Sequence, residues 1–82
     1  MTTSDDAYRP IACARYSELE VLAMRGATVD VELPGSGQRL RGRVRDLRTR
    51  AGVEYLVLET AEGVCEELRL DRIGDVLVVG AR

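Results

Sequence analysis

Four arginines alternate with other residues in the middle of the chain and form its most regular charged pattern. They are Arg39, Arg41, Arg43 and Arg45. Side chains two apart on a strand share a face, so the four guanidinium groups would form a row. Each group could meet a phosphate or a carboxylate through two parallel hydrogen bonds. The pattern therefore allows an RNA-binding surface, or a solvated outer face neutralised by Asp30, Glu32 and the acids of neighbouring strands.

The composition favours the structural interpretation of this row. Binding of single-stranded RNA normally uses aromatic platforms on which bases stack. The sequence contains no Phe or Trp, and its three tyrosines are Tyr8, Tyr16 and Tyr55. We therefore expect little direct binding of nucleic acid, and we keep an RNA-binding module that uses the arginine row as the alternative.

Groups suited to catalysis lack the partners that they would need. The candidate nucleophiles are Ser4, Ser17, Ser36, Cys13 and Cys65, but the chain has no histidine to act as their base. Glu66 and Glu67 are adjacent, so on a strand they would point to opposite faces. The sequence thus predicts neither an enzyme nor a cofactor.

The two cysteines lie 52 residues apart, which excludes the CxxC spacing of zinc and thioredoxin-like motifs. We expect no metal site, and the sequence leaves undecided whether the two cysteines form a disulfide. Cys13 is expected to be a small buried hydrophobic residue. The sequence contains no secretory signal or membrane span, which favours a cytoplasmic protein with reduced thiols.

A length of 82 residues with a net charge of −2 indicates one small domain. We expect a flexible leader over residues 1–7 and a single domain over residues 8–82. The charge is unevenly placed along the chain. Residues 26–52 carry six arginines and three acids, whereas residues 53–82 carry three arginines and seven acids.

One helix is predicted near the N-terminus. Ser17 and Glu20 have the spacing of a capping box, and Gly26 is a natural C-terminal stop. The helical face would consist of Tyr16, Leu19, Leu22 and Ala23. An earlier start, near Cys13 or Ala14, would instead place Ser17 and Glu20 inside the helix.

A period of two follows from residue 27 and predicts five strands. Their expected ranges are 28–33, 39–45, 53–60, 64–70 and 76–79. Gly42 suits a sharp bend, and the slip in alternation after Asp46 indicates a bulge or a strand end. The strand 53–60 is apolar on both faces, so it should be central, with Tyr55 in the core. Such a sheet solves its edge problem by closing, which predicts a strongly bent antiparallel barrel of the SH3-like, Sm-like or OB type.

Two resemblances narrow these possibilities. The segments Val29-Asp30-Val31-Glu32-Leu33 and Gly42-Arg43-Val44-Arg45-Asp46, preceded by a helix, resemble the first half of an Sm-type fold. Residues 8–20 resemble the Y-x-P-I-x-C-x-x-Y-[DS]-x-L-E opening of the Rho-binding antiterminator (Rof) family. The segments V-E-Y-L-V at 53–57 and E-L-R-L-D-R-I at 67–73 also match that family.

The Rof resemblance covers most of the chain and implies a function. It implies an Sm-like barrel with an N-terminal helix that binds the termination factor Rho at the OB-fold domains of its primary RNA-binding site. By competing with RNA there, the protein would inhibit Rho-dependent termination. Carried over to this sequence, the resemblance implies that Tyr16, Ser17, Glu20 and Arg50 contact Rho, and that the free protein is a monomer. Ser17 stands where the family often has an acid, and Ala51-Gly52 stand where it has polar residues.

Overall fold

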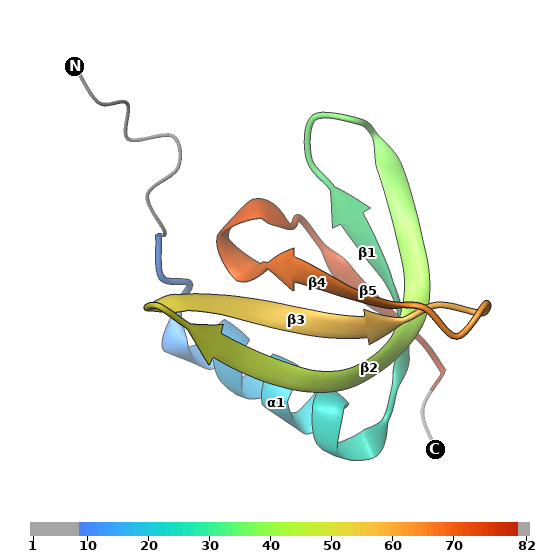
Figure 1. Cartoon of the computed structure of the whole chain (residues 1–82), viewed down its shortest axis with the longest axis horizontal. Helices are drawn as coiled ribbons and strands as arrows, with labels where there is room; N and C mark the ends of the chain where they lie inside the picture. The colour runs from blue at the N-terminus through green and yellow to red at the C-terminus, as the bar shows by residue number, and fades with distance from the viewer. Residues whose placement is uncertain (1–8, 81–82) are drawn as a thin grey trace.

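The fold consists of one helix and five strands in the predicted order (Figure 1). It is described by a computed structural model of residues 9–80, so the leader predicted for residues 1–7 lies outside the described residues. The elements are α1 (Cys13–Arg25), β1 (Thr28–Leu33), β2 (Gln38–Arg50), β3 (Val53–Glu59), β4 (Cys65–Arg69), the 3-10 helix η1 (Leu70–Arg72) and β5 (Val76–Gly80).

Helix α1 begins earlier than its capping motif suggested. The N-cap residue is Ala12, which offers no side-chain hydrogen bond, and Ser17 and Glu20 lie inside the helix. The predicted capping box is therefore wrong, and the alternative start at Cys13 is confirmed. The same S-x-x-E spacing also fits one face of a helix interior, because residues three apart are neighbours there. Gly26 ends the helix in the left-handed region (φ 60°), as predicted.

The five strands form one antiparallel sheet in the order β4-β3-β2-β1-β5. The mainly β fold and the strong bend are confirmed, whereas the predicted closure into a barrel is wrong. The connection after η1 brings the chain to β1, where Gly74 N donates to Glu32 O (2.8 Å) and Glu32 N donates to Asp75 O (2.9 Å). Strand β5 consequently pairs with β1, and β4 and β5 are the two edges of the open sheet.

Strand β2 is the middle of the sheet, and β3, which was predicted to be central, has a neighbouring strand on each side as expected. Strand β2 pairs with β1 over residues 38–43 and with β3 over residues 43–50, so its two halves serve two different neighbours. Figure 1 shows how sharply β2 curves between them. Gly42 lies in this bend, and a Cβ atom there would approach Glu59 O and Leu58 Cγ to 2.7 Å. The glycine predicted to permit the bend is therefore required by close packing.

A β-bulge at Arg45 sets which side chains of β2 face the core. Val44 pairs with Leu58 and Asp46 with Val57, which leaves Arg45 as an extra residue. The inward positions change from even to odd numbers, so Leu47 packs against the core. Arg48 and Arg50 thereby join Arg39, Arg41, Arg43 and Arg45 on the opposite side, which we call the outer face.

The core lies between α1 and the inner face of the sheet. Its buried residues are Leu19, Ala27, Val29, Val31, Val44, Leu56, Leu58, Leu70 and Ile73. Tyr16 packs against this cluster as predicted. Tyr55 does not, because it pairs in register with Arg48 on the outer face and is only half-buried.

A small polar network fixes the segment before α1 to the end of β4. Arg69 contacts Asp71 through Nε–Oδ1 (3.1 Å) and Nη2–Oδ2 (2.9 Å), and Arg9 N donates to Asp71 Oδ2 (3.0 Å). The Asp71 side chain is only 6% exposed. Burial alone would raise the pKa of Asp71, but these hydrogen bonds and the Arg69 charge outweigh it and hold the pKa below 3.8.

We expect Asp71→Asn to lower the free energy of unfolding by about 2 kcal/mol at pH 7, because it removes a charge-assisted pair from a nearly buried position. The pKa of Asp71 is lower in the folded state than in the unfolded state, where it is 3.8. The stabilisation by the Asp71 carboxylate is therefore complete above pH 3.8, and it is lost as the pH falls through the pKa of the folded state. Urea unfolding of both proteins at pH 7 and pH 3 measures it. A stability difference that is the same at both pH values would contradict the prediction.

Candidate partner-binding site

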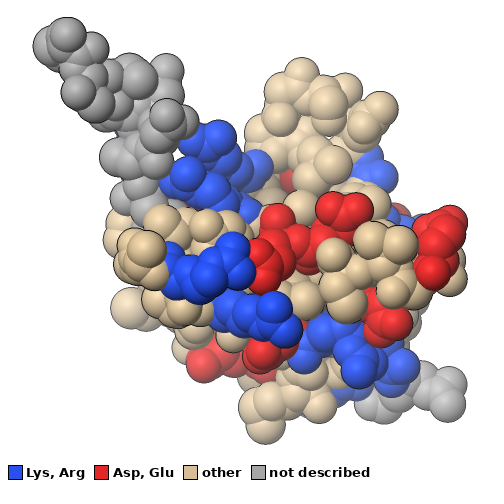
Figure 2. Space-filling view, viewed as in Figure 1, with Lys and Arg blue, Asp and Glu red and all other residues tan. Residues whose placement is uncertain are grey.

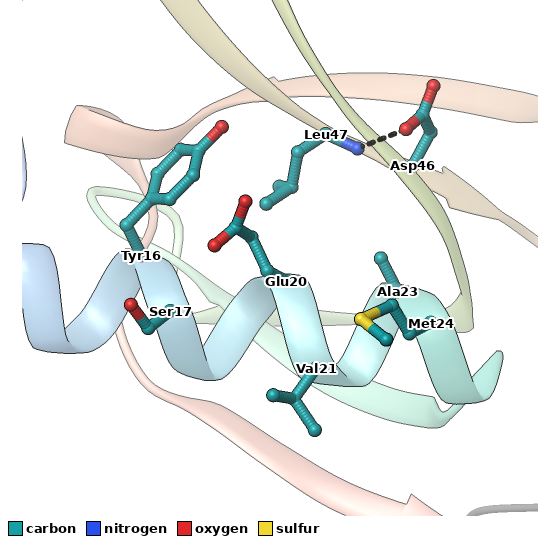
Figure 3. A pocket seen from close by; sticks show the side chains of 8 residues that line it. All are labelled: Tyr16, Ser17, Glu20, Val21, Ala23, Met24, Asp46 and Leu47. Atoms are coloured by element: carbon teal, nitrogen blue, oxygen red, sulfur yellow. Dashed lines mark hydrogen bonds between the residues drawn. The ribbon is translucent and has the colours of Figure 1, made fainter.

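The predicted helix residues Tyr16, Ser17 and Glu20 lie along a hollow between α1 and the β2 bulge (Figure 3). The hollow has a volume of about 430 Å³, and its remaining lining residues are Val21, Ala23, Met24, Asp46 and Leu47. Figure 3 shows that the Tyr16 ring and the Glu20 carboxylate both project from the helix toward Leu47. One turn of α1 thus presents an aromatic ring and a carboxylate together.

Carboxylates from three elements act on Tyr16. Burial raises the pKa of its phenol, and the negative charges of Glu54, Glu20 and Asp46 raise it further. The hydroxyl therefore stays protonated at neutral pH and is available as a hydrogen-bond donor. The site has a negative potential around a neutral aromatic ring.

Asp46 lies at the rim of the hollow, but the bulge places its carboxylate on the outer face, beside Arg48. Pairing with β1 ends at Arg43, so the following stretch of β2 has no strand on that side. Leu47 N donates to Asp46 Oδ1 (2.8 Å), which holds the carboxylate close to the backbone of β2. The only ion pair described for Asp46, with Arg48 Nε, is long (3.7 Å) and exposed.

Asp46 and Glu54 are the site residues that the sequence analysis missed. The slip in alternation after Asp46 was the available signal for Asp46, since it marked the bulge. The position of Glu54 could have been predicted from the core residue Leu56, because residues two apart on a strand share a face.

Arg50, the fourth predicted site residue, lies on the outer face, away from the three helix residues. It donates to both Glu67 oxygens (2.6 and 3.0 Å), and its guanidinium carbon lies 4.7 Å from the centroid of the Tyr55 ring. Hydrogen bonds from Arg50, assisted by Arg48, lower the pKa of Glu67. Arg50 is nevertheless accessible, since 58% of its side chain is exposed.

The arginine row of β2 is extensively matched by acceptors. Arg41 forms a bidentate pair with Asp30 (2.7 and 3.0 Å), Arg43 Nε donates to Gly26 O (3.0 Å), and Arg45 lies 3.5 Å from Glu59. Arg39 is exposed and lies opposite Glu32 in register. Figure 2 shows basic and acidic side chains side by side over the visible face. This arrangement supports the structural interpretation of the row, and RNA binding by it stays an untested alternative.

Metal binding, the two cysteines and membrane insertion can each be compared with the described part of the chain. Within residues 9–80, no group of three or more His, Cys, Asp or Glu side chains could hold a metal ion. Cys13 and Cys65 are both free and exposed, so the expectation of a buried Cys13 is wrong. No helix in the same range has the length and apolar character needed to cross a bilayer.

Comparison with known proteins identifies the family. Residues 10–80 match the family model described as "Modulator of Rho-dependent transcription termination (ROF)". The chain is 42% identical over 69 residues to the protein called rof in Escherichia coli strain K12, covering 84% of this chain and 80% of that protein, and the Shigella flexneri protein gives the same values. The chain therefore belongs to the Rof family of modulators of Rho-dependent transcription termination, which is not a family of enzymes.

Proposed function

We propose that this protein inhibits Rho-dependent termination by binding Rho at the OB-fold domain of its primary RNA-binding site and competing with RNA. The observation that carries the proposal is the pairing of the Tyr16 ring with the exposed Glu20 carboxylate on one turn of α1, beside an open hollow (Figure 3). As a modulator of termination, the protein would act in the cytoplasm, where transcription takes place.

The chemistry of an RNA-binding surface supports this choice of partner. Such a surface attracts phosphates with basic side chains and stacks bases on aromatic groups. The Tyr16 ring has the flat apolar faces of a base, and the surrounding carboxylates have the charge of phosphates. A surface that combines both features is complementary to a site built for RNA, and electrostatic attraction would speed its association with that site.

Arg50 has a different role in this proposal. Its guanidinium is fixed by Glu67 and Tyr55 on the outer face, so it would contact a part of Rho beyond the surface that meets α1. The following turn is tight, with Ala51 at φ 51° and Gly52 at φ 78°. Because Ala51 and Gly52 offer no polar side chain, Arg50 supplies the contacts at this end of β2.

A reconstituted transcription assay tests the proposal. We expect the protein to increase read-through at a Rho-dependent terminator in a concentration-dependent manner, and to leave an intrinsic terminator unaffected. Rho bound to labelled RNA should release that RNA as the protein is added. Unchanged termination at micromolar concentration in low salt would contradict the proposal.

The control is the protein mixed with RNA in the absence of Rho. We expect no mobility shift, because the arginine row is matched by acids and carbonyl groups. A shift that weakens steeply with salt and disappears in Arg41→Ala/Arg43→Ala would favour the RNA-binding alternative. In size-exclusion chromatography, the free protein is expected to elute as a monomer.

A further inference from the structure

We propose that the free edge of β5 binds an extended segment of a partner protein as a further strand of the sheet. The segment would place apolar side chains on the α1 side and would carry a basic residue beside Glu18 and Asp75. This surface lies on the other side of α1 from the Rho contact, because Glu18 is about 160° around the helix axis from Glu20. The inference therefore goes beyond the proposed function and does not depend on it.

The two edges of the sheet differ in their protection against pairing. Strand β4 has the sequence CEELR, with three charged side chains, whereas β5 has the sequence VLVVG and none. Charged side chains on an edge strand discourage pairing with another chain. Strand β5 pairs with β1 on one side only, so its other side offers backbone N–H and C=O groups without this protection.

The side chains of β5 are exposed on both faces of the sheet. Leu77, Val78 and Val79 are consecutive, and all three are exposed large hydrophobic residues. Because neighbours on a strand point to opposite faces, Val78 faces the α1 side and the other two face the outer side. Contiguous exposed apolar surface marks sites of interaction. An added strand would cover both faces of this edge at once.

A groove separates β5 from α1 on the inner side of the sheet. The helix packs mainly against β2, so it leaves β5 uncovered. The groove has a volume of about 370 Å³, and its lining residues are Glu18, Val21, Leu22, Val76 and Val78. An adjoining hollow of about 450 Å³ shares Glu18, Leu22 and Val76 with it and extends it toward the start of α1. Apolar side chains of an added strand would enter this groove.

The charges at one end of the groove indicate a basic residue in the added strand. Glu18 and Asp75 both line the adjoining hollow, and both are exposed. Within residues 9–80 neither carboxylate forms an ion pair, and the nearby Arg15 guanidinium donates to Gly74 O. Complementary charges at an interface select the partner and fix its register. A basic side chain opposite Val76 would lie close to both acids.

A second copy of this protein matches the groove less well. Its own β5 would pair through uncharged residues, so it would leave Glu18 and Asp75 unmatched. Addition of a strand to a sheet edge is a common mode of peptide recognition, and antiparallel pairing is the more stable arrangement. In antiparallel pairing, the matching segment reads from its N-terminus as apolar, any residue, apolar, any residue, basic.

The test is an NMR titration of the isotope-labelled protein with a synthetic peptide in which threonine alternates with valine, valine and arginine, in that order. We expect saturable shifts of the amide signals of β5 and of Glu18. The same peptide with glutamate in place of arginine should bind about 10-fold more weakly, because it brings like charges together. Absence of saturable shifts on β5 would overturn the proposal.

Two substitutions examine the strand edge and the acidic end of the groove separately. Val78→Lys adds a charge to the edge and should weaken binding of the arginine peptide by about 10-fold or more. Val64→Lys makes the same change at a residue of similar exposure (52% against 56%) between β3 and β4, and should alter affinity by less than about 2-fold. Glu18→Gln should weaken binding of the arginine peptide by about 3-fold and strengthen binding of the glutamate peptide. Unchanged amide signals of β3 show that each variant is folded.

The outcomes distinguish this inference from the proposed function and from self-association. Val78→Lys and Glu18→Gln should inhibit Rho-dependent termination as the wild type does, so failure of the peptide to bind would leave that function intact. Equal affinity for the arginine and glutamate peptides would overturn the basic partner. A dimer that is detected by sedimentation and lost in Val78→Lys would identify a second copy as the occupant, which would also overturn the proposal.

Discussion

Glu20→Arg should weaken binding to Rho by about 100-fold. The substitution removes a carboxylate from the hollow and places a positive charge where a basic surface is expected to approach. Like charges brought together at an interface cost several kcal/mol, and 100-fold corresponds to about 2.7 kcal/mol. Calorimetry at low salt would give the affinity, and read-through in the termination assay should fall in parallel.

Glu18→Arg is the matched control, because it makes the same change of charge on the same helix. Glu18 lies about 160° around the helix axis from Glu20 and lines a different hollow, next to Val76. We expect it to bind Rho within about 3-fold of the wild type, with the remaining difference arising from net charge. Equal losses for the two variants would mean that only overall charge matters, and would contradict a specific contact at Glu20.

Gly42→Ala should produce the largest loss of stability among single-methyl additions to the sheet. The new Cβ would lie 2.7 Å from Glu59 O, a backbone atom, and 2.7 Å from Leu58 Cγ in the core. Neither neighbour can move without disturbing the bend of β2, so we expect a loss of about 3 kcal/mol. For a chain of this length the total is about 4–12 kcal/mol, so urea unfolding should show a large shift of the midpoint.

Gly80→Ala is the corresponding control. A Cβ at Gly80, near the end of β5, would meet no atom within 4 Å. We expect the free energy of unfolding to change by less than about 0.5 kcal/mol. If Gly42→Ala proved as well tolerated as Gly80→Ala, the bend of β2 would not depend on close packing at this position.

The strands were readable from the sequence because their alternation is a local property. Val29 and Val31 on β1, and Leu56 and Leu58 on β3, are buried at the positions where a period of two places them. The helix was located correctly, but its start was misjudged since the S-x-x-E spacing of Ser17 and Glu20 occurs at helix starts and in helix interiors alike. Closure of the sheet was beyond local patterns, because it depends on where the connection after η1 carries β5.

The candidate site was predicted in part for the same reason. Tyr16, Ser17 and Glu20 lie within two turns of one helix, so their proximity follows from helical geometry alone. Glu54 is brought to the helix side by the pairing of β3 with β2, and the bulge turns the carboxylate of Asp46 to the outer face; both are tertiary features. Arg50 was grouped with the helix by resemblance, but the bulge directs its side chain to the outer face.

The extra residue at Arg45 divides β2 into two stretches whose side chains alternate in opposite phase. Before it, even-numbered residues such as Leu40 and Val44 face the core, and after it the odd-numbered Leu47 does. Loss of this one residue would remove the bulge and leave Val44 and Leu47 on alternate ladder positions, so both would still face the core. Loss of two residues would instead reverse the phase beyond this point, turning Leu47 to solvent and the charged Arg48 toward the core. The tolerance of this strand to changes in length should therefore alternate with the parity of the change, as strand periodicity requires.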